Sequence, residues 1–261
     1  FLCSSDFGRS LEESRDDLQS LGYDTPVPLI RSDSYTTLLD ATPEYGGYIN
    51  AHMDGKAVAG MIANNPEWNA PDGWTTYFAT DDIDATLQRV ADNGGGNCMQ
   101  AMEVPQLGYM GLFGDPSGAV VGLWQPLAHK GFQLVAEAGA PVWHELNTRE
   151  YDKAVDFYTK VLGWDTKVEG DSEEFRYACA QHGGEPIAGV NDATVGQWAL
   201  PEGVPAHWAV YFGTSDTDAS AARATELGGV VLTPVQDTPY GRMALVRDTT
   251  GATFWLCSVD S

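Results

Sequence analysis

Residues 142–164, VWHELNTREYDKAVDFYTKVLGW, contain the pattern that decides the fold of this chain. The segment begins with a strand-like stretch, Val142 to Asn147, and a turn with acidic residues follows. An amphipathic helix is expected next, because apolar residues recur at three- and four-residue steps and so share one face. Those apolar residues are Ala154, Phe157, Tyr158, Val161 and Leu162. Gly163 comes directly after them, as is common at the C-terminal end of a helix.

Weaker copies of this strand–helix unit recur along the chain, which indicates an internal repeat. Each copy is expected to contain a strand, a helix and further strands. The expected helices are 10–21, 83–93, the one within 142–164, and about 217–227. The expected strands outside 142–164 are 1–5, 48–53, 57–62, 74–79, 98–103, 109–113, 119–124, 207–212, 240–246 and 252–257.

The second and fourth copies align almost without gaps. Trp74 matches Trp208, Asp115 matches Asp248, and Gly118 matches Gly251. Matches that extend over half of the chain and include turn glycines indicate a duplicated domain. We therefore predict two tandem domains, at residues 1–126 and 139–261, joined by a linker at 127–138.

Composition and charge restrict the partners of the protein. The formal net charge is −23, and such a field repels nucleic acid and anionic membrane surfaces. No apolar run is long enough to span a bilayer, and no signal-peptide pattern is found near Phe1. The four cysteines show no metal-ligand spacing and fit buried thiols in a reducing compartment. A cytoplasmic protein without a nucleic-acid or membrane partner is expected.

Several short motifs resemble those of the vicinal-oxygen-chelate superfamily, which includes glyoxalase I, extradiol dioxygenases and bleomycin-resistance proteins. They are Phe157-Tyr158 followed by Leu162-Gly163-Trp164, and the turns at 115–118 and 248–251 before a last strand. The chain looks most like two-domain actinobacterial members of the glyoxalase-like type. This resemblance implies an α+β fold of two tandem glyoxalase-like domains. Each domain would have two βαβββ modules that form a curled eight-stranded sheet around a cavity.

The same resemblance allows a test for the metal site of the superfamily. Its metal-dependent members usually place His or Glu in the first strand of each module and in the final strand. The matching positions are Trp143, Ala209 and Trp255 in the second domain, and Leu2, Thr75 and Gly122 in the first. None of these side chains is a metal ligand. We therefore expect neither the usual metal site nor another cofactor.

A different site remains possible in the second domain. Strand alternation places Trp143, Glu145 and Asn147 on one face, and His144 on the opposite, helix-packed face. The same argument groups His207 with Tyr211, and Trp255 with Cys257. Glu145 and His207 are the catalytic candidates, as a general acid/base pair or as ligands of an altered metal site. In the alternative interpretation, Arg242 neutralises Glu145, and His207 lies in solvent at a strand end.

The candidate substrate-binding residues are Trp143, Asn147, Tyr211, Arg242 and Trp255. The two tryptophans either stack on a flat ligand or fill the cavity. A metal-independent lyase, isomerase or cyclase that uses Glu145 is the first hypothesis for the function. A non-catalytic protein that sequesters a drug or metabolite is the second, and a metal-dependent enzyme with a displaced site is the third. The partner in each case is a small organic molecule, and the oligomeric state is left open.

The first domain is expected to be mainly structural. Ser4 occupies the position of Glu145, and Asp16 and Asp17 replace the aromatic pair Phe157-Tyr158. These exchanges remove both the candidate acid/base group and the apolar face of the helix.

Overall fold

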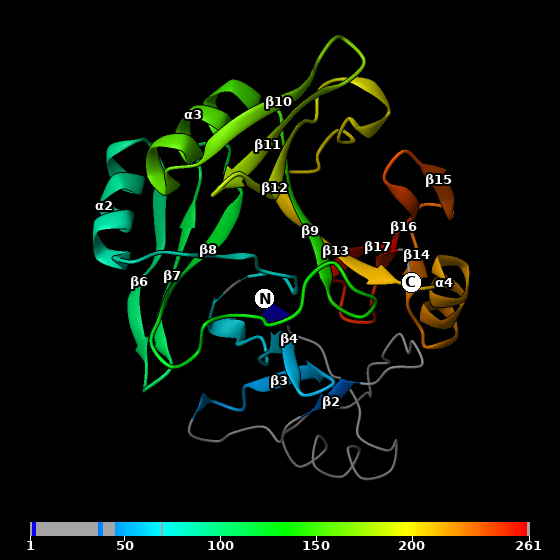
Figure 1. Ribbon diagram of the computed structural model, residues 1–261, viewed down its shortest axis with the longest axis horizontal. Coiled ribbons are helices and arrows are strands. Elements are labelled where there is room, and N and C mark those ends of the chain that lie inside the picture. Colours follow the sequence, from blue (N-terminus) through cyan, green and yellow to red (C-terminus); the bar gives the residue numbers. More distant parts are fainter. Residues whose placement is uncertain (1, 4–35, 39–44, 69, 260–261) are drawn as a thin grey trace. The chain divides into compact units, whose positions relative to one another are not determined.

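The computed structural model describes residues 2–3, 36–38, 45–68 and 70–259 (Figure 1). The predicted helix 10–21, and with it Asp16 and Asp17, lies outside these residues, as does Ser4. The chain forms two compact units. We call residues 75–131 and 143–209 the central unit, and residues 1–74, 132–142 and 210–261 the terminal unit. Each unit combines segments from both predicted domains, so the boundaries at 1–126 and 139–261 stay a prediction.

The central unit contains two segments, each with a strand, a helix and further strands. The four strands of each segment are hydrogen-bonded neighbours. The first segment consists of β5 (Tyr77–Ala79), α2 (Ile83–Asp92), β6 (Gly96–Val104), β7 (Gly108–Gly114) and β8 (Val120–Pro126). The second consists of β9 (Pro141–Thr148), α3 (Tyr151–Leu162), β10 (Asp165–Asp171), β11 (Arg176–His182), β12 (Glu185–Asp192) and the 3-10 helix η3 (Gly196–Trp198). The strand orders are β5-β8-β7-β6 and β10-β11-β12-β9. In both segments the first strand pairs in parallel with the last.

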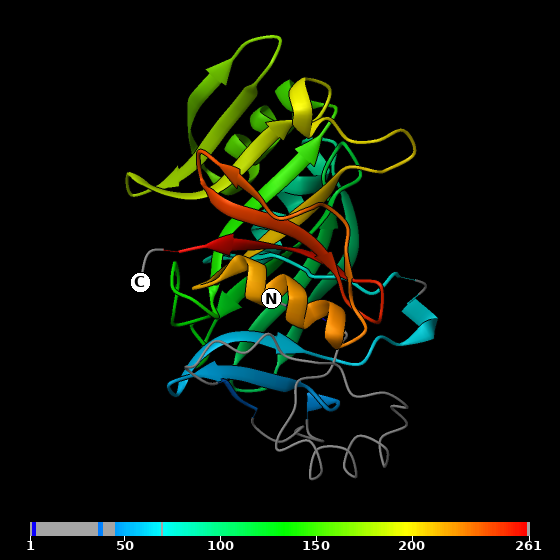
Figure 2. The ribbon, with the colours of Figure 1, turned by 90° about the vertical axis from the view of Figure 1, so that its right-hand side faces the viewer.

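The terminal unit repeats this topology. Its first part contains β1 (Leu2–Cys3), β2 (Thr36–Leu38), β3 (Ile49–Met53), β4 (Lys56–Met61) and η2 (Pro66–Trp68). Its second part contains most of β13 (His207–Thr214), then α4 (Thr217–Glu226), β14 (Val230–Val231), β15 (Gln236–Thr238), β16 (Gly241–Arg247) and β17 (Thr253–Ser258). The strand orders are β1-β4-β3-β2 and β13-β17-β16-β14, with β15 paired to β16. Figure 2 shows α4 alongside β16 and β17, which it contacts. The expected α+β class is confirmed, whereas the curled eight-stranded sheets stay a prediction.

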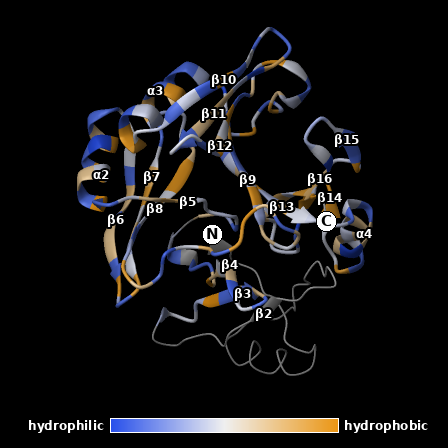
Figure 3. Cartoon of the chain, in the orientation of Figure 1, coloured by the Kyte–Doolittle hydropathy of each residue, from blue (hydrophilic) through white to orange (hydrophobic). Residues whose placement is uncertain are grey.

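The ends of the helices follow from local sequence. Asp82 caps α2, because its side chain accepts a hydrogen bond from the Ala85 N–H at 2.9 Å. Asp216 caps α4 in the same way through Ala219, also at 2.9 Å. Helix α3 ends at Gly163, whose φ of 68° is the left-handed conformation that glycine adopts at least cost. In Figure 3 the turns of α3 alternate between hydrophilic and hydrophobic residues, as expected for an amphipathic helix.

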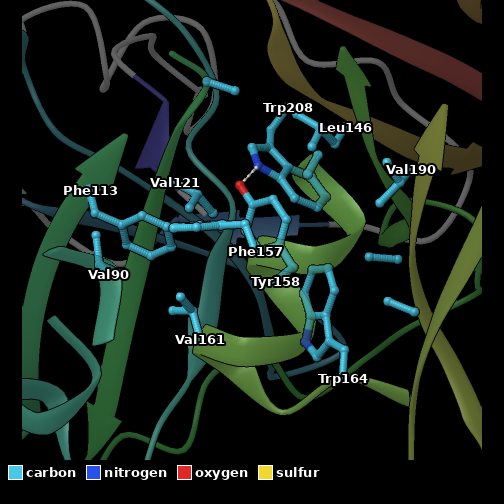
Figure 4. Close-up of a cluster of buried hydrophobic side chains, with 14 of the residues drawn as sticks. Val90, Phe113, Val121, Leu146, Phe157, Tyr158, Val161, Trp164, Val190 and Trp208 are labelled. Atoms are coloured by element: carbon cyan, nitrogen blue, oxygen red, sulfur yellow. Dashed lines mark hydrogen bonds between the residues drawn. The ribbon is translucent and has the colours of Figure 1, made fainter. Parts of the chain in front are cut away.

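The core of the central unit is built around the apolar face predicted for α3 (Figure 4). Phe157 and Tyr158 are buried in it, and Trp208 contributes its indole ring. The Trp208 Nε1–H donates to the Tyr158 hydroxyl at 2.9 Å, and that hydroxyl donates to Asp115 Oδ2 at 3.0 Å. Burial raises the pKa of Tyr158 well above its ordinary value, so the phenol stays protonated and able to donate. Trp208 is therefore a core residue.

Replacing Tyr158 with phenylalanine is expected to lower the free energy of unfolding by about 2–6 kcal/mol. The exchange leaves the buried Trp208 N–H and one Asp115 carboxylate oxygen without their partner, and each loss costs about 1–3 kcal/mol. Urea unfolding followed by circular dichroism measures the change. Tyr240→Phe is the matched control, because the Tyr240 side chain is 66% exposed. Equal stability of the two variants would contradict a role of this hydrogen-bond chain in the core.

No helix in the described part of the chain is long and apolar enough to cross a membrane.

Candidate functional site

Strand β9 divides its side chains between two faces. Leu146 is fully buried in the core, and His144 is buried with its Nδ1 atom 3.2 Å from the Thr76 hydroxyl oxygen. Burial lowers the pKa of His144 to about 3, so the ring is neutral at physiological pH. Trp143, Glu145 and Asn147 alternate with these two residues and therefore lie on the other face, as predicted.

Tyr177 on β11 connects two of the predicted site residues. Trp143 Nε1–H donates to the Tyr177 hydroxyl at 2.8 Å, and this hydroxyl donates to Glu145 Oε2 at 2.9 Å. The indole has no lone pair to offer, so the Tyr177 proton points to Glu145. Burial, and then the negative charge of Glu145, raise the pKa of Tyr177 well above its ordinary value. Tyr177 thus keeps its proton, and the Glu145 carboxylate accepts a hydrogen bond from the Tyr177 hydroxyl.

A glycine and a second aromatic ring fix the position of Tyr177. The Tyr177 hydroxyl lies directly over Gly189 of β12, where a Cβ atom would overlap it. The Phe175 ring stacks on the Tyr177 ring, with centroids 5.5 Å apart and an interplanar angle of 12°. The phenol can therefore lean across β12 to Glu145 on β9 only because residue 189 has no side chain.

An asparagine pair lies in the next row of the same face. Asn191 of β12 is directly opposite both Tyr177 and Asn147 in the strand register. Its Nδ2 atom donates to Asn147 Oδ1 at 2.9 Å, and both side chains are buried. We call Trp143, Glu145, Asn147, Tyr177 and Asn191, grouped around Gly189, the central polar patch.

His207 has a partner in its own loop. It begins β13, and its Nδ1 atom is 3.0 Å from the Pro205 carbonyl oxygen. Glu145 receives its hydrogen bond from Tyr177 instead. Through Tyr177, hydrogen bonds connect Glu145 with Trp143.

The other predicted residues belong to the terminal unit. Tyr211 and Trp255 are register partners on β13 and β17, and their rings stack in parallel with centroids 5.6 Å apart. Trp255 is also the register partner of Leu245 on β16. Arg242, three residues before Leu245 and so on the opposite side of β16, faces α4 and bonds to Asp218 at 2.5 Å and to Asp237 at 2.9 Å.

Arg242 was predicted to bind the substrate or, in the alternative interpretation, to neutralise Glu145. Its guanidinium group has Asp218 and Asp237 as carboxylate partners, and it lies away from the Tyr211–Trp255 pair. The predicted ion pair with Glu145 is replaced by the hydrogen bond from Tyr177. Arg242 therefore serves to join β16 to α4 and β15.

The residues that the structure describes do not provide the metal site of the superfamily. No three His, Cys, Asp or Glu side chains come together within 45–68 and 70–259 to hold an ion. At the first ligand position, Trp143 donates its only polar hydrogen to Tyr177. The donor set thus does not fit a metal, and we derive no step through one.

Sequence reasoning did not find Tyr177, Asn191, Phe175 or Gly189. Tyr177 alternates with the buried Ala178, and Gly189 lies inside a strand, where glycine often marks the close approach of another group. These signals were present in the sequence. What was missing is the register that places β11 and β12 beside β9, since strand pairing depends on the whole sheet.

Replacing Gly189 with alanine is expected to displace Tyr177 and break its bonds to Trp143 and Glu145. Because the new methyl group would overlap the Tyr177 hydroxyl, we expect a loss of about 1–3 kcal/mol in unfolding free energy. Near-ultraviolet circular dichroism and urea unfolding measure both effects. The control is Gly96→Ala on β6, where a Cβ atom meets nothing within 4 Å. An unchanged aromatic signal in Gly189→Ala would contradict the described packing.

The fold agrees with the comparisons to known proteins. The profile of the Glyoxalase/Bleomycin resistance protein/Dioxygenase superfamily matches residues 131–256. The chain is 39% identical over 234 residues to "Putative glyoxylase CFP32" of Mycobacterium tuberculosis, covering 84% of this chain and 86% of the relative. It therefore belongs to this superfamily, whose members bind or act on small molecules.

A second relative has a more specific name. The chain is 36% identical over 252 residues to the anthracycline biosynthesis protein DnrV of Streptomyces peucetius, covering 88% of each protein. Among solved structures, the Mn(II)-bound glyoxalase of Novosphingobium aromaticivorans has a TM-score of 0.53 and 16% identity, covering 87% of this chain and 75% of the other. A 2,2',3-trihydroxybiphenyl 1,2-dioxygenase of Sphingomonas wittichii has a TM-score of 0.53 and 12% identity, covering 87% and 81%. These structures support the fold alone.

Proposed function

We propose that the central polar patch binds a planar organic molecule and transfers a proton to or from it, with Glu145 as the acid/base group. The observation that carries this proposal is the hydrogen bond from Tyr177 to Glu145, which holds the carboxylate in one orientation. The similarity to an anthracycline biosynthesis protein supports a fused-ring aromatic ligand. The aromatic rings of Trp143, Phe175 and Tyr177 offer the surfaces on which such a ligand stacks.

Glu145 is the group whose protonation changes in this mechanism. Tyr177 keeps its proton because its pKa is raised, and Trp143 contributes only an N–H donor. When the carboxylate takes a proton from the ligand, the bond from Tyr177 keeps the other oxygen in place. Glu145 then returns the proton to a different atom, which gives an isomerase, or assists a leaving group, which gives a lyase. No step requires a metal or another cofactor.

Two further parts of the proposal come from the sequence, namely the curled sheets and the cellular compartment. We place the patch on the inner face of one of the curled sheets expected for paired βαβββ modules. The free thiols of Cys98, Cys179 and Cys257 support a reducing compartment such as the cytoplasm.

The second candidate function is sequestration of a drug or metabolite without turnover. It is favoured by the contact of His207 Nδ1 with the Pro205 carbonyl oxygen, which occupies one of the two ring nitrogens of the second predicted acid/base group. In this case the patch is a binding surface, and Glu145 recognises the ligand without reacting with it.

Titration with 1,4-dihydroxyanthraquinone, followed by quenching of tryptophan fluorescence, tests the binding step. We expect saturable binding that is weakened at least about tenfold in Tyr177→Ala, since this exchange removes an aromatic surface and the support of Glu145. Tyr240→Ala, at an exposed position, should bind like the wild type. Absence of saturable binding, or equal affinity of the Tyr177 variant, would reject the patch as the site.

A further inference from the structure

The connection between β12 and β13, residues 193–206, lies on the surface of the central unit beside the β10–β11 hairpin (Figure 1). None of residues 194–206 is buried. Gly196 and Gly203 within this connection have positive φ angles of 67° and 84°. A surface segment without buried side chains has little local stability of its own. The position of the connection therefore depends on the polar contacts that fasten it to the strands.

Arg149, the residue after β9, provides several of these contacts with one side chain. Its Nη1 group donates to the Val204 carbonyl oxygen at 2.7 Å. Its Nη2 group donates to the carbonyl oxygens of Leu200 and Pro201 at 3.0 and 2.8 Å. Hydrogen bonds from a charged donor are stronger than those between neutral groups. The guanidinium group thus fixes the second half of the connection to the end of β9.

The first half of the connection starts at the edge of the central polar patch. Asn191 and Asn147 are register partners, and the pairing of β12 with β9 ends one residue later. The next residue, Ala193, donates its N–H to the Thr148 carbonyl oxygen at 2.8 Å. The connection therefore leaves the sheet directly beside the asparagine pair.

A glycine of the connection reaches the other side of the patch. Gly196 packs so closely on the Glu174 carbonyl oxygen that a Cβ atom at residue 196 would overlap it. Glu174 precedes Phe175, whose ring stacks on the Tyr177 ring. The connection thus extends from the end of β9 to the β10–β11 hairpin and borders the central polar patch along one end.

We infer that Arg149 is a positioning residue, which holds residues 193–206 as an end wall of the central polar patch and so slows the release of a bound ligand. This inference rests on the proposed function and adds the residue that controls how long the ligand stays bound. Arg149 acts through backbone carbonyl groups, so it takes no part in proton transfer. Without its guanidinium group the wall detaches at Leu200, Pro201 and Val204, and the ligand leaves faster.

Hydrogen exchange followed by mass spectrometry tests the position of the wall in the full chain without a ligand. Arg149→Met keeps an unbranched aliphatic side chain and removes all three hydrogen bonds. We expect amide exchange in residues 194–206 to become at least about tenfold faster, while exchange in α3 stays unchanged. Arg223→Met is the matched control, because Arg223 on α4 pairs with Glu226. Unchanged exchange of the connection in Arg149→Met would overturn the inference.

Stopped-flow fluorescence with 1,4-dihydroxyanthraquinone tests the effect of the wall on binding. We expect the dissociation rate constant to rise about five- to tenfold in Arg149→Met, and the association rate constant to change by less than about threefold. Arg223→Met should match the wild type in both rate constants. Equal dissociation rates of Arg149→Met and the wild type would reject the wall and leave the proposed binding function intact. If this quinone does not bind to the wild type, the proposed function and the inference fail together.

Chemical rescue separates positioning by Arg149 from a general loss of stability. In Arg149→Ala, guanidinium ions at millimolar concentration can occupy the space of the missing group and donate to the same carbonyl oxygens. Amide exchange and ligand dissociation should then both return towards the wild-type rates. Sodium chloride at the same concentration is the control for ionic strength. A guanidinium effect no larger than that of sodium chloride would show that these hydrogen bonds do not hold the wall, against the inference.

Discussion

Glutamine in place of Glu145 is expected to lower the turnover of a bound ligand by about 10²- to 10⁴-fold, the range typical of general acid/base groups. The amide has almost the shape of the carboxyl group and can still accept the hydrogen bond from Tyr177, which is 2.9 Å long in the native protein. It cannot take up a proton at neutral pH. The dissociation constant of the ligand should therefore change by less than about threefold, and the loss should appear in the chemical step.

Single-turnover mixtures analysed by liquid chromatography measure this step directly, because excess protein removes product release from the observed rate. The control is Glu103→Gln, an exposed exchange on β6 in the same unit, which should leave the rate unchanged. A normal rate in Glu145→Gln would eliminate the acid/base role. A wild type that binds the ligand tightly but converts none of it would instead support sequestration.

Much of the local structure could be predicted because its causes are local. The helix of residues 151–162 and its end at Gly163 follow from apolar spacing and from the conformational freedom of glycine. The opposite faces of His144 and Glu145 follow from strand alternation alone. The parallel pairing of first and last strands then recurs in all four segments of the chain, as expected of a repeat.

The candidate site could be predicted only in part because its contacts join distant residues. Glu145 was expected to need a partner, but Arg242 was an arbitrary choice among the cations of the chain. One of its partners, Tyr177, is 32 residues away and reaches it across a glycine. Likewise, a lone asparagine gives no sign of pairing until the register places Asn191 beside Asn147. Positions on one strand were thus predictable, whereas partners on neighbouring strands were not.

Acidification from pH 6.5 towards pH 4 is expected to destabilise the protein through His144. Burial depresses the pKa of this imidazole from 6.5 to about 3 in the folded chain. Between these two values the unfolded state therefore binds one proton more than the folded state. Stability rises with pH wherever the unfolded state binds more protons, so here it falls as the pH falls, by about 1.4 kcal/mol per unit. Above pH 6.5 neither state binds this proton and the effect is absent.

Urea unfolding at a series of pH values, compared between the wild type and His144→Gln, isolates this contribution. The glutamine variant is less stable at pH 8, because it must repack around the Thr76 hydroxyl, but its stability should depend less on pH between 6.5 and 4.5. His182→Gln, at an exposed position, should retain the wild-type slope. Parallel slopes for the wild type and His144→Gln would contradict a neutral buried His144. Carboxylates titrate alike in all three proteins, so the difference between slopes reports only the proton that His144 takes up on unfolding.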